Sequence, residues 1–145
     1  MAQLLKLTAK DNLHFMKHLR ANTDKEICFT AQKCEKPTKV ANVFWETFPG
    51  LLARNTALKH LSCSFDSDAS YSRMGINAIT EALRVNSSLM ALDLHACLIE
   101  VDEANAIVKT IQGNSCITDL DLGGNKITRE ALSIIKEALQ ENSSL

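Results

Sequence analysis

Short strand-like segments alternate with amphipathic helical segments along this chain. The clearest pair lies near the end, where residues 118–122 predict a strand and the residues after a Gly-Gly-Asn turn predict an amphipathic helix ending near Asn142. The preceding stretch repeats this unit position for position. Leu89 lies 28 residues before Ile117, and Ile117 lies 28 residues before Leu145. A period of this length indicates that one strand–helix unit is stacked several times.

An asparagine closes each predicted helix. Every helix ends with a large apolar residue, two spacers and an asparagine, and asparagine suits this place because it tolerates the left-handed backbone conformation. The five asparagines are Asn22, Asn55, Asn86, Asn114 and Asn142. Three residues after the middle three, the next strands begin at Leu58, Leu89 and Ile117.

These spacings make residues 1–145 a single repeat domain. Residues 1–22 are expected to form an N-terminal half-repeat that caps the stack, because an end repeat has only one neighbour to bury against. The four full repeats are 23–55, 56–86, 87–114 and 115–142. Residues 143–145 begin a further repeat or end the chain.

The second repeat is irregular. Its strand, over residues 26–30, places Ile27 and Phe29 inward only if the spacing slips by one residue. Pro49 falls inside its helix, and proline lacks an amide donor and clashes with the previous turn, so we expect a kink or a short break there. Trp45 aligns with an apolar position of the next repeat, which favours a core role over an exposed anchor.

Right-handed crossovers between successive strand–helix units give parallel strands. The last two repeats begin with the pattern L-x-x-L-x-L-x-x-N/C, which is the signature of a leucine-rich repeat. We therefore predict an α/β fold, a right-handed βα solenoid or leucine-rich-repeat horseshoe. A short parallel sheet forms its concave side, and α-helices form its convex side.

The motifs LMALDLHACLI and ITDLDLGGNKIT, each followed by a helix ending in L/I-x-x-N, resemble the ribonuclease-inhibitor-like class of leucine-rich repeats. The resemblance is strongest over residues 58–145, weaker over 23–57 and weakest before them. The same architecture is seen in NOD-like receptors, Ran GTPase-activating protein and tropomodulin-like actin regulators. The resemblance implies protein binding on the concave face or its rims, while the arginine and loop features of a GTPase activator are not recognisable here.

The amino-acid composition argues against several classes of function. The chain is 46% hydrophobic and carries a formal net charge of −1, so no global field draws it to nucleic acid or a membrane. The basic residues form no stripe, no apolar stretch is long enough for a bilayer, and the first residues lack the pattern of a secretory signal. The five cysteines include no C-x-x-C pair, which favours free thiols in a reducing compartment over disulfides or zinc. We expect a cytoplasmic protein.

Strand alternation selects the candidate binding residues. On the concave face we expect His60, Ser62, Asp93, His95, Asp119 and Asp121 to contact a partner, with Phe65 at the rim as an apolar anchor. The irregular repeat adds Glu26, Cys28 and Thr30 to the same face. Neighbouring parallel strands lie about 4.8 Å apart, so Asp93 and Asp121 should be side by side.

Two readings of this aspartate pair compete. Repulsion between the carboxylates favours protonation or a bound cation, for which His95 would add a nitrogen ligand. The alternative is a solvated acidic strip that binds protein, which we favour because Asp93 and Asp121 both belong to the repeated motif. An open sheet also lacks the enclosed pocket that shifts carboxylate pKa values for catalysis.

No other motif predicts catalysis. Ser62 and Ser64 lie near His60, but no G-x-S-x-G elbow or oxyanion-hole signature accompanies them. The Gly-Gly-Asn turn lacks the Lys-Ser/Thr of a phosphate-binding loop. We therefore predict a protein that is not an enzyme and uses neither a metal nor another cofactor.

The primary hypothesis is a protein-interaction module that displays side chains at fixed spacing on its concave face. One alternative is a regulatory or accessory repeat domain of a larger enzyme or signalling protein, and another is a recognition protein of host defence or of a pathogen. Leu145 takes the first position of a further repeat, so we expect an open C-terminal edge. That edge fits a fragment of a longer array, self-association, or a last repeat polar enough to stand alone.

Overall fold

The computed structural model describes residues 5–8, 12–31, 39–65, 69–140 and 142, in which strands and helices alternate. The strands are β1 (Leu5–Thr8), β2 (Glu26–Ala31), β3 (His60–Phe65), β4 (Ala91–Asp93) and β5 (Asp119–Asp121). The helices are α1 (Asn12–Ala21), α2 (Lys39–Arg54), α3 (Ala69–Leu83), α4 (Val101–Gln112) and α5 (Arg129–Gln140).

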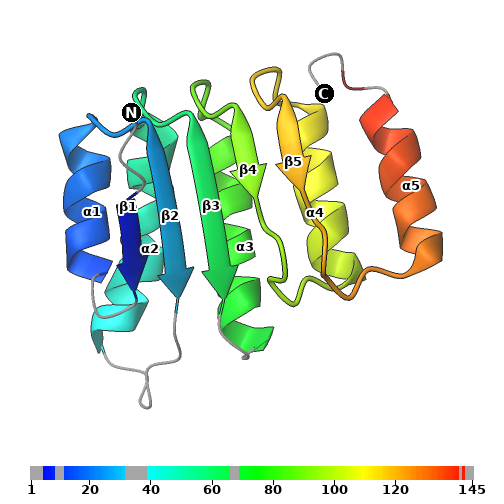
Figure 1. The fold of residues 1–145 in the computed structure, drawn as a ribbon, viewed down its shortest axis with the longest axis horizontal. Helices are drawn as coiled ribbons and strands as arrows, with labels where there is room; N and C mark the ends of the chain where they lie inside the picture. The colour runs from blue at the N-terminus through cyan, green and yellow to red at the C-terminus, as the bar shows by residue number, and fades with distance from the viewer. Residues whose placement is uncertain (1–4, 9–11, 32–38, 66–68, 141, 143–145) are drawn as a thin grey trace.

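The five strands form one parallel sheet in chain order, β1-β2-β3-β4-β5. Figure 1 shows the sheet as one layer and the helices as a second layer behind it, with the stack running from α1 to α5. The predicted βα solenoid is confirmed. The helices leave one side of the sheet uncovered, which we call the open sheet face. We propose the repeat division at 23–55, 56–86, 87–114 and 115–142 because each interval holds one strand and one helix.

The core lies between the sheet and the helices. Residues of β3 alternate in burial, so that Leu61 and Cys63 face the helices while His60 and Ser64 are exposed on the open face. The helices pack apolar residues at helical spacing against this side of the sheet, and one of these residues, Ile76 in α3, has no exposed surface. Burying a side chain of this size stabilises the fold by about 1.5–3 kcal/mol, so the two layers depend on each other.

The asparagine after each helix connects neighbouring repeats. Asn86 is 3% exposed, and its Nδ2 donates to the carbonyls of Leu52 and Asn55 at 2.7 and 2.9 Å. Its Oδ1 accepts from the amides of Ser88 and Leu89 at 3.0 and 2.9 Å. One side chain thereby bonds to four backbone groups in two successive loops, and its Oδ1 is the acceptor that pairs the buried amides of Ser88 and Leu89.

Asn114 makes the same four bonds one repeat later, and Asn55 donates to the carbonyl of Leu19 and accepts from the amides of Ala57 and Leu58. Asn142 also donates to the preceding repeat, to the carbonyls of Ile111 and Asn114. Among these asparagines only Asn22 has a left-handed backbone, with φ 54°. The expected left-handed conformation at the other positions is wrong, because the asparagine is required there for its side chain and not for its backbone.

A second polar connection lies where the strands end. Asn125 accepts through Oδ1 from the amides of Cys97 and Ile99 at 2.8 and 3.0 Å, and its Nδ2 donates to the carbonyl of Leu94. In the preceding repeat Cys97 takes this place and donates through Sγ to the carbonyl of Cys63 at 3.0 Å. The N/C position of the motif therefore bonds to backbone groups where the chain leaves the strand.

The irregular second repeat departs from expectation at one point. Helix α2 continues through Pro49, so the short break considered there does not occur. The missing amide removes one helical bond, whereas Phe44 and Phe48 on the same helix are 0% and 2% exposed and hold it against the core. Ile27 is buried as predicted, and the side chain of Phe29 lies outside the described part of the chain.

Replacing Asn86 with alanine is expected to lower the free energy of unfolding by about 3–5 kcal/mol, because the buried amides of Ser88 and Leu89 lose their acceptor together. Urea denaturation followed by circular dichroism measures the change. Asn77→Ala, on the exposed side of α3, is the matched control and should stay within about 0.5 kcal/mol of the wild type. Equal losses in the two variants would contradict the connecting role of Asn86.

Candidate functional site

The strand register gathers polar side chains from three repeats on the open sheet face. Two rows of directly paired residues cross β3, β4 and β5. These rows are Ser62–Asp93–Asp121 and His60–Ala91–Asp119. The prediction that Asp93 and Asp121 lie side by side is confirmed.

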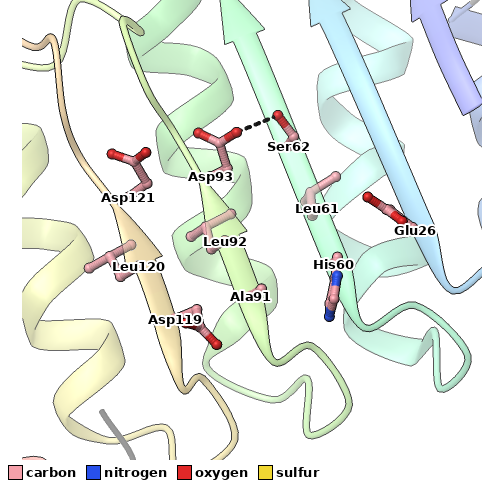
Figure 2. Close-up of a pocket in the computed structure, with 10 residues that line it drawn as sticks. All are labelled: Glu26, His60, Leu61, Ser62, Ala91, Leu92, Asp93, Asp119, Leu120 and Asp121. Carbon is pink, nitrogen blue, oxygen red and sulfur yellow. Dashed lines mark hydrogen bonds between the residues drawn. The ribbon is translucent and has the colours of Figure 1, made fainter. Parts of the chain in front are cut away.

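The rows border a shallow hollow of about 320 Å³, which we call the acidic hollow. Figure 2 shows its residues projecting from adjacent strands. Its lining residues are Glu26, His60, Leu61, Ser62, Ala91, Leu92, Asp93, Asp119, Leu120 and Asp121. Four of these carry carboxylates and one is a histidine, so the hollow has a negative potential that attracts cationic groups.

Asp93 is held at the centre of the hollow. Its Oδ2 accepts from the Ser62 hydroxyl at 2.8 Å, and its Oδ1 accepts from the backbone amide of His95 at 2.9 Å. The side chain is half-buried and both oxygens are engaged. Asp93 therefore has a defined orientation, with its charge stabilised by donors from its own strand and its neighbour.

His95 lies beyond the hollow, over the turn that follows β5. Its Nδ1 is 3.8 Å from Oδ1 of Asp121, an oxygen that accepts from the amide of Gly123 at 2.7 Å. A Cβ at residue 123 would lie 2.9 Å from the histidine Nδ1, and one at Gly124 would lie 3.0 Å from its Nε2. The two glycines thus leave room for the imidazole, a role that the turn pattern of the sequence did not indicate.

The structure does not support Phe65 as an exposed anchor. Phe65 is 4% exposed and lies on the helix side of the sheet, with its ring centroid 6.2 Å from that of Trp45. Its ring also occupies the space where a Cβ of Gly75 would be. Phe65 is a core residue because its strand position alternates toward the helices, and Trp45 packs half-buried against the core as predicted.

Two cysteines, Cys63 and Cys97, have thiols of low reactivity. Burial raises the pKa of the Cys63 thiol well above its ordinary value, and it raises the pKa of Cys97 to about 12. Both thiols therefore stay protonated at neutral pH. Cys28 and Cys116 are half-buried and also free, while Cys34 lies outside the described residues.

The metal-ion alternative concerns Asp93, Asp121 and His95 on the open sheet face. In the described part of the chain, no three or more His, Cys, Asp or Glu side chains are grouped so that they could hold a metal ion. Asp93, Asp121 and His95 are therefore not a metal centre of this kind. Over the same residues, the helices are too short or too polar to cross a membrane.

No family model matches this sequence, and no curated protein matches it. Solved structures do match. One is actin-binding site 2 of leiomodin-1, with a TM-score of 0.65 and 20% identity, covering 90% of this chain and 73% of the other. Another is the C-terminal domain of tropomodulin from Caenorhabditis elegans, with a TM-score of 0.50 and 14% identity, covering 97% of this chain and 85% of the other.

These matches concern the fold. Together with the sheet order and the repeated asparagine bonds, they show that the chain has the ribonuclease-inhibitor-like leucine-rich-repeat fold that the sequence predicted.

Replacing Phe65 with alanine is expected to destabilise the protein by about 3–5 kcal/mol, because a buried ring is removed and a cavity remains. Chemical denaturation measures the loss. Met74→Ala, at a side chain that is 40% exposed on α3, is the control and should cost far less. A stable Phe65→Ala protein would restore Phe65 as a surface residue.

Proposed function

We propose that this chain is a protein-interaction module and that the acidic hollow is its partner-binding surface. The observation that carries the proposal is the convergence of four carboxylates from three strands on one open depression. These carboxylates belong to Glu26, Asp93, Asp119 and Asp121. A partner that presents lysine or arginine side chains would complement them, and arginine suits carboxylates best because it binds in a bidentate manner.

The structure favours binding over catalysis at this face. The hollow is open to solvent, while Ser62 and the amide of His95 already donate to Asp93. Neighbouring strands fix the spacing of the side chains, so little conformational entropy is lost when a partner docks. Such a surface selects a partner by charge and shape and performs no bond-making step, which supports a role other than that of an enzyme.

Exposed charges set how this face binds. The side chain of Asp121 is 56% exposed, so the attraction of its carboxylate for a basic partner is screened by salt. Charge complementarity of this kind mainly speeds association and excludes wrong partners. The same chemistry would serve an accessory domain of a larger enzyme or signalling protein, with the basic surface supplied by a neighbouring domain.

The structural match to a leiomodin actin-binding site makes actin the first partner to test. The similarity extends over 90% of this chain, although at 20% identity it does not carry binding residues across. Actin binding is thus the narrower form of the proposal, and binding by the acidic hollow is the broader form. The two need separate experiments.

The broader form is tested by removing charge from the hollow without changing its shape. The triple variant Asp93→Asn/Asp119→Asn/Asp121→Asn keeps an oxygen acceptor at each position. We expect it to weaken binding of the natural partner about tenfold or more while the protein stays folded. Affinity capture from cell lysate with quantitative mass spectrometry identifies the partner, and calorimetry with the purified partner measures affinity.

The matched control removes the same charge from the helices. The control substitutions are Glu81→Gln, Asp102→Asn and Glu137→Gln, all at exposed positions of α3, α4 and α5. It should bind like the wild type, because its net charge changes equally but the hollow does not. A partner retained equally by both triple variants would show that binding occurs elsewhere.

The narrower form is tested with purified monomeric actin and the wild-type chain. We expect saturable one-to-one binding that weakens as salt rises and is reduced in the hollow variant but not in the helix variant. Fluorescence anisotropy of labelled actin provides the measurement. Absence of binding at low salt would exclude actin and leave the broader form to the lysate experiment.

A further inference from the structure

Two histidines meet at the end of the stack opposite β5. His14 and His18 lie one turn apart on α1, and their Nε2 atoms are 2.9 Å apart. Their ring centroids are 4.5 Å apart, and the ring planes make an angle of 65°. If the two rings lay in line, the distance between their centroids would equal the 2.9 Å between the Nε2 atoms plus one ring radius on each side, which is more than the observed 4.5 Å. The two rings are therefore inclined to each other and do not lie in line.

Asp24 orients one of the two rings. The Nδ1–H of His18 donates to Oδ2 of Asp24 at 2.8 Å, and the two side chains are 26% and 29% exposed. This bond places the lone pair of neutral His18 on Nε2, so neutral His14 donates its own Nε2–H to that lone pair. A carboxylate behind an imidazole is the usual device that fixes the tautomer and orientation of a metal-binding histidine.

The separation suits a chelating pair. Two nitrogens bound about 2.0 Å from one metal ion and at right angles lie about 2.8–2.9 Å apart, whereas a tetrahedral angle separates them by about 3.3 Å. The observed spacing thus matches two adjacent positions of a square-planar or octahedral ion, and a small opening of the rings gives the tetrahedral case. His14 becomes a ligand when its proton moves from Nε2 to Nδ1 through solvent, so neutral imidazoles release no proton.

We propose that His14 and His18 chelate a divalent transition-metal ion of the Ni²⁺, Cu²⁺ or Zn²⁺ class, for which imidazole is a preferred ligand. Asp24 acts as a positioning residue. The described residues contain no group of three or more such side chains that could hold a metal, so water completes the coordination. Since Asp24 precedes β2 and the histidines belong to α1, the bound ion would stabilise the link between these elements.

The test uses the whole chain and Ni²⁺ as the probe. Calorimetric titration should show one ion bound per chain. Below one equivalent, the paramagnetic ion should broaden the ring-proton resonances of His14 and His18 before those of His60 and His95. His14→Ala should lose this binding, and Asp24→Ala should weaken it about tenfold, the low end of the effect of removing such a partner.

The other two histidines provide the matched control. The variant His60→Ala/His95→Ala also removes two imidazoles but leaves the α1 pair intact, so it should bind Ni²⁺ like the wild type. Because His14 is exposed, its alanine variant is expected to stay folded, which a thermal melt without metal verifies. Wild-type affinity in His14→Ala, or loss of binding in the control variant, would overturn the proposal. Neither result bears on the acidic hollow.

Discussion

The buried asparagines that follow α2, α3 and α4 are the constraint on which the rest of the structure depends. A solenoid turns from helix to strand inside its own stack, where the loop's amides and carbonyls have no access to water. Asn86 and Asn114 bond to such groups in two loops at once, because each donates to carbonyls of the preceding repeat and accepts from amides at the start of the following repeat. The bonds therefore set the spacing between repeats as well as the stability of each loop.

That spacing has a direct consequence on the open sheet face. Since β3, β4 and β5 each begin five residues after equivalent asparagines, equivalent strand positions pair across the sheet, and Asp93 comes to lie beside Asp121. The polar bonds of Asn125 and Cys97 hold the other end of the strands. A row of side chains held at both ends has few conformations to lose, which is the physical basis for its use as a recognition surface.

The two ends of the stack differ in chemistry. At the β5 end, carboxylates lie on an open sheet and are bonded to hydroxyl and amide donors, so they offer charge to a large partner. At the α1 end, a single carboxylate lies behind a pair of imidazoles, an arrangement that suits a small ion. The repeat explains the first arrangement, because aspartate recurs at one position of the motif. The second belongs to the capping segment and has no counterpart in the repeats.

The sequence by itself determined the repeat, the parallel sheet and the identity of the polar strand residues, because period and alternation are local properties of the chain. It also predicted that Asp93 and Asp121 pair, since equal repeats place equivalent residues side by side. Only the tertiary structure decided that Phe65 is buried, that α2 continues through Pro49 and that Gly123 and Gly124 accommodate His95. Each outcome depends on neighbours distant in sequence: the space above Gly75, the core beneath Phe44 and Phe48, and an imidazole from the preceding repeat. The contact of Asp24 with His18 has the same origin, because a spacing of four residues on a helix brings two histidines together but cannot show which carboxylate stands behind them.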